Sequence, residues 1–73
     1  MTLAEIKKEL AKSWCNGFYI DLPNFSSNER IYLTKNGSTF HYKQFSSGKE
    51  WVEKSSLMSS ELKSSEWSIR EKQ

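Results

Sequence analysis

Residues 30–45 read RIYLTKNGSTFHYKQF, two alternating runs on either side of an Asn36-Gly37 pair. An Asn-Gly pair in this setting is the strongest short-range signal for a β-hairpin with a two-residue turn, because both central residues of a type I′ turn need positive φ. A two-residue loop also fixes the register, which places Leu33 opposite Phe40 and Tyr32 opposite His41. The sequence therefore predicts a central antiparallel hairpin.

The two faces of this hairpin differ in character, because side chains along a strand point alternately to opposite sides. The face expected to be core carries Ile31, Leu33, Phe40 and Tyr42. The face expected to be open carries Arg30, Tyr32, Thr34, Thr39, His41 and Lys43. Residues 1–28 and 46–73 are each balanced in charge, so the net charge of +2 comes from the hairpin and its immediate flank.

The chain before the hairpin predicts a helix and a strand. Thr2 and Glu5 form a capping box, and apolar residues follow at helical spacing, which indicates an amphipathic helix over about residues 3–13. Its inward positions are Leu3, Ile6, Leu10 and, at the end of the pattern, Trp14. Gly17 is expected to supply the left-handed residue that ends the helix.

Residues 17–22 alternate, with Phe18, Ile20 and Leu22 on the inward side and Tyr19 and Asp21 on the outward side. This pattern predicts a half-buried strand. Pro23 stops the strand, because proline cannot donate to the ladder. Phe25 in the following loop is expected to fold back onto the core.

Two interpretations of residues 49–65 remain open. The favoured one is a short strand or turn through Trp51, followed by a short helix near Leu57–Lys63 with Ser55 or Ser56 as its N-cap. In the other, Trp51, Met58 and Leu62 share one side of a serine-rich helix. Residues 66–70 alternate again and predict a last strand with Trp67 and Ile69 inward.

These elements predict a single small α+β domain over residues 1–73, with an N-terminal helix packed on an antiparallel sheet of three to four strands around the central hairpin. A chain of 73 residues buries a small core, so self-association as a homo-oligomer is favoured. No run approaches the roughly 20 apolar residues of a membrane span, and none has the length of a signal peptide. A cytoplasmic location is expected.

Catalysis is not expected, because the chain has one cysteine and one histidine. A single cysteine excludes an intrachain disulfide and a cysteine-based metal cluster. Cys15 and His41 are the only thiol–imidazole pair, and each is more commonly a structural or surface residue than a nucleophile and its base. The three glycines each mark a turn and form no phosphate-binding loop. We expect no enzyme activity, no cofactor and no metal.

The candidate binding residues are Arg30, Tyr32, His41, Lys43 and Trp51. Arg30 and Lys43 are suited to phosphate, whereas Tyr32 and His41 offer stacking surfaces, a combination found in proteins that hold nucleotides or single-stranded nucleic acid. The alternative is an ordinary solvated sheet face. Trp51 is the candidate aromatic anchor for a protein partner.

Both ends of the chain resemble a family of small phage proteins, the second type of Thoeris anti-defence domain. The resemblance lies in the helix followed by SWCNGFYI at residues 13–20, in Glu61-Leu62, and in Glu66-Trp67-Ser68-Ile69. It implies a compact α+β oligomer that sequesters an immune signal of the cyclic ADP-ribose type.

The expected function is therefore that of a small non-catalytic binding protein, encoded by a phage and acting in the cytoplasm of the host cell. It would neutralise a host defence factor, either by sequestering a nucleotide signal or by binding a host protein through an exposed aromatic residue such as Trp51. The alternative is a single-stranded nucleic-acid-binding module that uses the basic and aromatic hairpin face.

Overall fold

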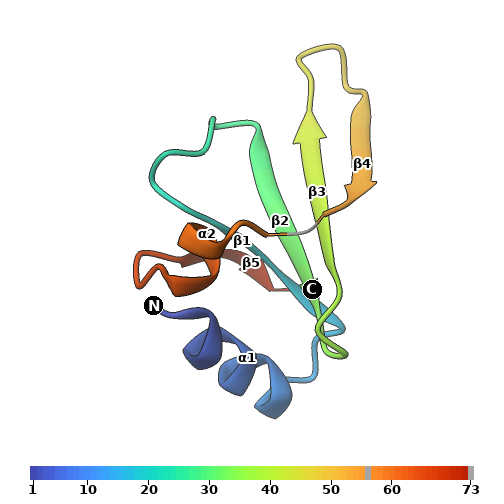
Figure 1. The fold of residues 1–73 in the computed structure, drawn as a ribbon. Helices are drawn as coiled ribbons and strands as arrows, with labels where there is room; N and C mark the ends of the chain where they lie inside the picture. Colours follow the sequence, from blue (N-terminus) through green and yellow to red (C-terminus); the bar gives the residue numbers. More distant parts are fainter. Residues whose placement is uncertain (56, 73) are drawn as a thin grey trace.

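The computed structural model describes residues 1–55 and 57–72 and forms an α+β domain. Its elements in chain order are α1 (Leu3–Lys12), β1 (Gly17–Asp21), β2 (Glu29–Thr34), β3 (Thr39–Gln44), β4 (Glu50–Lys54), α2 (Ser59–Lys63) and β5 (Ser68–Lys72). The strands form one antiparallel sheet in the order β4-β3-β2-β1-β5 (Figure 1). The sheet has five strands rather than three to four, because residues 50–54 and 68–72 both pair as strands.

Helix α1 forms as its sequence predicts at the start but ends earlier than expected. Thr2 and Glu5 make the capping box, and Leu3, Ile6 and Leu10 are buried. The last helical residue is Lys12, and Ser13 is the C-cap, whose N–H donates to the Leu10 carbonyl at 3.1 Å.

Two expectations for the end of α1 were wrong. Trp14 lies beyond the helix and is fully exposed, because Ser13 turns the chain into an extended conformation before the helical pattern reaches it. Gly17 has no positive φ and is not a helix cap. It is instead the first residue of β1, where it lies beneath the ring of Tyr32.

The core lies between α1 and one face of the sheet. Phe18, Ile20, Ile31 and Leu33 are buried on that face, as expected for the inward positions of β1 and β2. Burying such side chains is the main favourable contribution to folding.

Trp67 completes this core just before β5. Its indole N–H donates to the Glu61 carbonyl at 2.8 Å, and its ring meets Phe25 edge-to-face with centroids 5.9 Å apart. The expected inward positions of Trp67 and of Phe25 are thereby confirmed.

The hairpin between β2 and β3 forms, but its predicted register was wrong by one residue. Leu33 pairs with Thr39, Tyr32 with Phe40, and Ile31 with His41. The reason lies in the turn, where Gly37 has a φ of 90° and Asn36 has no positive φ. A type I′ turn needs both, so this is a three-residue loop with a type I turn followed by a left-handed glycine.

Polar side chains hold this longer loop. The Gly37 N–H donates to the Thr34 carbonyl at 3.0 Å, and the Thr34 N–H donates to the Ser38 carbonyl at 2.9 Å. The Ser38 N–H is shared by the Thr34 hydroxyl and the Asn36 side-chain oxygen, at 3.1 and 3.2 Å. The extra loop residue reverses the two faces of β3 relative to the prediction, since side chains alternate with period two.

The favoured interpretation of the serine-rich segment is confirmed in outline. Trp51 lies in strand β4, and the short helix α2 follows. The N-cap of α2 is Met58, whose N–H donates to the Glu61 carboxylate at 2.8 Å. Ser55 lies before this position, and Ser56, the other predicted cap, lies outside the described residues.

Candidate ligand-binding face

A cluster of tyrosines occupies the sheet face opposite α1. Tyr19 of β1, Tyr32 of β2 and Tyr42 of β3 form this tyrosine cluster, with ring centroids 4.7 Å apart for Tyr19 and Tyr32, 5.2 Å for Tyr19 and Tyr42, and 6.0 Å for Tyr32 and Tyr42. Each ring is half-buried by its neighbours. The three residues alternate with the core positions of their strands, so the cluster lies on the face that α1 does not cover.

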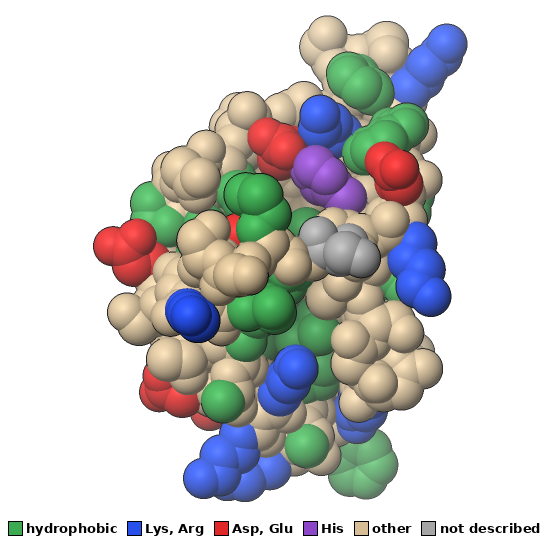
Figure 2. Space-filling model, viewed as in Figure 1, with side chains coloured by type: hydrophobic (Ala, Val, Ile, Leu, Met, Phe, Trp, Pro, Cys, Tyr) green, Lys and Arg blue, Asp and Glu red, His purple; other side chains and the backbone are tan. Residues whose placement is uncertain are grey.

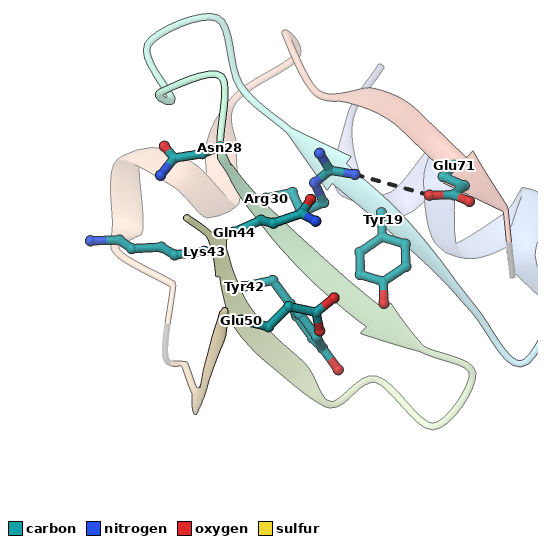
Figure 3. Close-up of a pocket in the computed structure, with 8 residues that line it drawn as sticks. All are labelled: Tyr19, Asn28, Arg30, Tyr42, Lys43, Gln44, Glu50 and Glu71. Carbon is teal, nitrogen blue, oxygen red and sulfur yellow. Dashed lines mark ion pairs between the residues drawn. The ribbon is translucent and has the colours of Figure 1, made fainter. Parts of the chain in front are cut away.

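A shallow pocket of about 140 Å³ opens beside the tyrosine cluster (Figure 3). Its lining combines aromatic rings, amides, carboxylates and cationic side chains from β1, β2, β3, β4, β5 and the loop before β2: Tyr19, Asn28, Arg30, Tyr42, Lys43, Gln44, Glu50 and Glu71. The pocket therefore offers donors, acceptors and an aromatic surface together, as sites for small polar ligands do.

Arg30 is the pocket cation that contacts the tyrosine cluster. Its guanidinium carbon lies 5.8 Å from the centroid of the Tyr19 ring, a cation–π distance. Its Nη1 atom is 4.0 Å from an Oε2 atom of Glu71, a long ion pair between partly exposed groups. The guanidinium is thus oriented by a ring and a distant carboxylate, and it retains donors for a ligand.

The Tyr19 hydroxyl of the tyrosine cluster is uncharged under physiological conditions. Burial raises the pKa of the Tyr19 hydroxyl above its ordinary value of 10.0, and the neighbouring Tyr42 raises it further. A neutral phenol does not repel an anion that approaches Arg30, and it keeps an O–H donor for a ligand.

The structure brings together only some of the predicted binding residues. Arg30 and Tyr32 lie on the open face, as expected. His41 and Lys43 lie on the opposite face, so the predicted grouping of four side chains on one surface was wrong. Trp51 also lies on that opposite face, because it pairs with Lys43. The cause is the three-residue turn, which reversed the faces of β3.

His41, Lys43 and Trp51 form a separate group on the sheet face that also carries the core residues Ile31 and Leu33, and the histidine is visible on the side of the molecule shown in Figure 2. The His41 Nε2 atom lies 2.7 Å from the Glu29 carboxylate, and the His41 and Trp51 rings meet edge-to-face at 5.5 Å. The Lys43 amino group lies 5.5 Å from the centroid of the Trp51 ring. His41 and Trp51 do not line the pocket beside the tyrosine cluster, whereas Lys43 is one of the residues that line it.

Glu29 gives this group a testable pH dependence. Burial raises the pKa of its carboxyl, but hydrogen bonds from His41 and Ser26 outweigh burial, so the pKa lies below the ordinary 4.5. A carboxyl whose pKa is lowered by folding stabilises the fold above its unfolded pKa, and this contribution is lost as pH falls through the folded pKa. Between neutral pH and about pH 3, we expect E29Q to lose less free energy of unfolding than the wild type does. The difference between the two losses is expected to be less than about 1 kcal/mol.

Urea denaturation of the wild type and E29Q at both pH values measures this difference. Glu66→Gln is the matched control, because that side chain is exposed. An equal loss of stability in wild type and E29Q would contradict the role given to Glu29.

Several residues of the pocket were missed in the sequence. The outward position of Tyr19 followed from the alternation of its strand, but nothing in the sequence tied it to the hairpin. Tyr42 was assigned to the core, and the reversed register places it in the cluster instead. Asn28, Glu50 and Glu71 come from a loop and two later strands, and only tertiary structure joins them.

Among residues 1–55 and 57–72 there is no group of three histidine, cysteine or acidic side chains that could hold a metal ion. Cys15 is half-buried against the core cluster. No helix in the described part of the chain has the length and apolar character to cross a membrane.

Comparisons with protein-family models, with curated proteins and with solved structures find no match to this chain.

Proposed function

We propose that this protein is a non-catalytic binding protein that holds a small nucleotide on the open face of its sheet. The observation that carries the proposal is the tyrosine cluster beside Arg30, on a sheet face that α1 does not cover. Aromatic rings on an open antiparallel sheet stack with bases, and an adjacent guanidinium pairs with phosphate oxygens. The pocket carboxylates and amides can accept and donate hydrogen bonds at the edges of a base.

The charge of this face favours a small nucleotide over a single-stranded nucleic acid. The outward positions of the sheet carry Arg30 and Lys54, but also Glu50, Glu71 and Asp21, the last of which is paired with Arg70 at 3.1 Å. Proteins that track a nucleic-acid backbone use a positively charged groove, which these carboxylates oppose. A ligand with one or two phosphates needs only the single guanidinium of Arg30.

The biological role that we propose is sequestration of a host immune signal. This step rests on the resemblance to the phage Thoeris anti-defence family, whose members bind a signal of the cyclic ADP-ribose type. A protein of this kind acts by occupancy, so it needs a binding pocket and no catalytic group. Binding of a host protein through Trp51 is the second candidate, supported by the partial exposure of that ring.

The test is native mass spectrometry of protein purified gently from cells, followed by titration with cyclic ADP-ribose and with a single-stranded oligonucleotide. We expect an adduct of nucleotide mass and saturable binding of the nucleotide. Tyr19→Ala and Arg30→Ala are each expected to weaken binding about five- to a hundredfold, the range for loss of one stacked ring or one charged hydrogen bond.

Trp14→Ala is the matched control, because the Trp14 ring is fully exposed and lies outside the pocket. Circular dichroism of each variant confirms that folding is retained. A protein that binds neither probe and carries no nucleotide adduct would contradict the proposal. A stoichiometric complex with a host protein that is lost on Trp51→Ala would replace it with the second candidate.

A further inference from the structure

Strand β4 leaves one edge of the sheet without a partner strand in the described chain. The Phe45 N–H donates to the Lys49 carbonyl at 2.9 Å, and the Ser55 N–H donates to the Thr39 carbonyl at 3.0 Å. Along an antiparallel ladder, hydrogen-bonded pairs alternate with pairs that are not hydrogen-bonded. Since Lys49 and Ser55 are bonded to β3, Trp51 is also bonded to it and Val52 is not.

The outward backbone groups of β4 therefore belong to alternate residues: Glu50, Val52 and Lys54. All residues of β4 are exposed, including Trp51 at 39% and Val52 at 47%. A row of unpaired N–H and C=O groups is a template for another strand. Charged side chains on such an edge usually prevent pairing, so the order of the charges decides what this edge accepts.

The order in β4 is self-complementary. The strand reads EWVEK, with an acidic residue at one end and a basic residue at the other, both on the same side of the sheet. We propose that β4 pairs antiparallel with β4 of a second copy of this chain, around a twofold axis at Val52. Glu50 of each copy then lies opposite Lys54 of the other, and the two Val52 side chains meet at the axis.

The neighbouring registers are less favourable. An axis at Glu53 would place Glu53 opposite Glu53 of the second copy, and directly opposed like charges are destabilising. An axis at Trp51 would place Lys54 opposite Gly48, in the turn before the strand, and would leave Glu50 opposite an apolar Val52. Only the register centred on Val52 pairs the whole strand and sets Glu50 opposite Lys54, with Glu53 opposite Trp51.

This dimer also extends the pocket of the open face. Glu50 lines the pocket, so Lys54 of the second copy would lie beside it and add a cation to a site that holds Arg30. The dimer itself does not depend on the proposed function, because backbone edge, charge order and exposed Val52 are independent of any ligand.

The test is the molar mass in solution across a concentration series, by light scattering after size exclusion. We expect the wild type to shift from monomer to dimer as concentration rises. Glu50→Lys and Lys54→Glu alone each place like charges in two symmetric positions, and each is expected to weaken the dimer about tenfold or more. The double variant E50K/K54E exchanges the charges and is expected to restore dimerisation.

A second variant tests the backbone pairing itself. Val52→Pro removes an N–H that points away from β3, so the monomer keeps its ladder while the dimer loses both hydrogen bonds at its axis. Its circular dichroism spectrum is expected to match the wild type, with a monomeric mass. A wild type that stays monomeric throughout the series would overturn the proposal, as would a double variant no better than the single ones.

The ligand test remains separate from this one. Loss of dimerisation in V52P with nucleotide binding retained would leave the proposed function intact. A dimer that binds no nucleotide would leave the edge pairing intact and remove the proposed function.

Discussion

Replacing Trp67 with alanine is expected to leave the protein largely unfolded at room temperature. The side chain is 1% exposed, and it contacts the core, Phe25 and the carbonyl of Glu61. Truncating a buried aromatic residue to alanine costs about 3–5 kcal/mol. A domain of this size without disulfides or metals has a total stability of about 3–5 kcal/mol, so the loss is comparable to the whole.

Far-ultraviolet circular dichroism and urea denaturation measure this loss. Trp14→Ala is the matched control, since it makes the same chemical change at a fully exposed position, and its stability is expected to change by less than about 0.5 kcal/mol. Trp67→Phe separates the two contributions, because it keeps most of the apolar volume but removes the indole N–H. A cooperative transition in W67A at the wild-type urea midpoint would contradict the packing described.

The second large effect is expected at Gly17, where alanine should destabilise the fold by about 1–3 kcal/mol. An added Cβ atom would lie 2.5 Å from the Cζ atom of Tyr32 and 2.6 Å from the carbonyl oxygen of Leu33. The ring can rotate away, but the carbonyl belongs to the ladder of β2 and cannot move without disturbing the pairing of Gly17 with Thr34. Both the tyrosine cluster and the strand pairing are therefore affected.

A double-mutant cycle with Tyr32→Ala identifies which contact dominates. If the ring accounts for part of the cost, Gly17→Ala is less destabilising in the Tyr32→Ala background than in the wild type. The remainder is assigned to the backbone carbonyl. An unchanged urea midpoint in Gly17→Ala would contradict this prediction. It would show that β1 and β2 can move apart to accept the added Cβ atom without loss of stability.

Elements governed by local chemistry could be predicted from the sequence. The capping box at Thr2 and Glu5, and the alternation of Phe18, Tyr19 and Ile20, each follow from hydrogen bonds or periodicity within a few residues. Such signals do not depend on what the segment packs against. The inward position of Trp67 could be predicted for the same reason, whereas the extent of the sheet depended on pairing between distant segments.

The register of the hairpin could not be predicted, because two turn types compete at one Asn-Gly pair. The two-residue turn would give Asn36 a positive φ, whereas the observed turn lets the Asn36 side chain and the Thr34 hydroxyl accept from the Ser38 N–H. These hydrogen bonds are each of order 1 kcal/mol, similar to the preference between turn types. So small a difference decides on which face Tyr42 lies.

The predicted faces of the candidate site residues depended on this turn. Arg30 and Tyr32 precede the turn, and their face was predicted correctly. His41 and Lys43 follow it, and they exchanged faces with their neighbours. A site assembled across a turn is only as predictable as the turn, even where each strand is recognised.

The pairing of β5 with β1 has a consequence for the speed of folding. Strands β1 to β4 follow one another in the sheet, so each contact closes a short loop, whereas Phe18 pairs with Lys72 across most of the chain. Contacts between distant residues form late, because the entropy of closing a long loop must be overcome before they contribute. We expect the four-stranded meander to form first, and the docking of Trp67 and β5 to limit the rate.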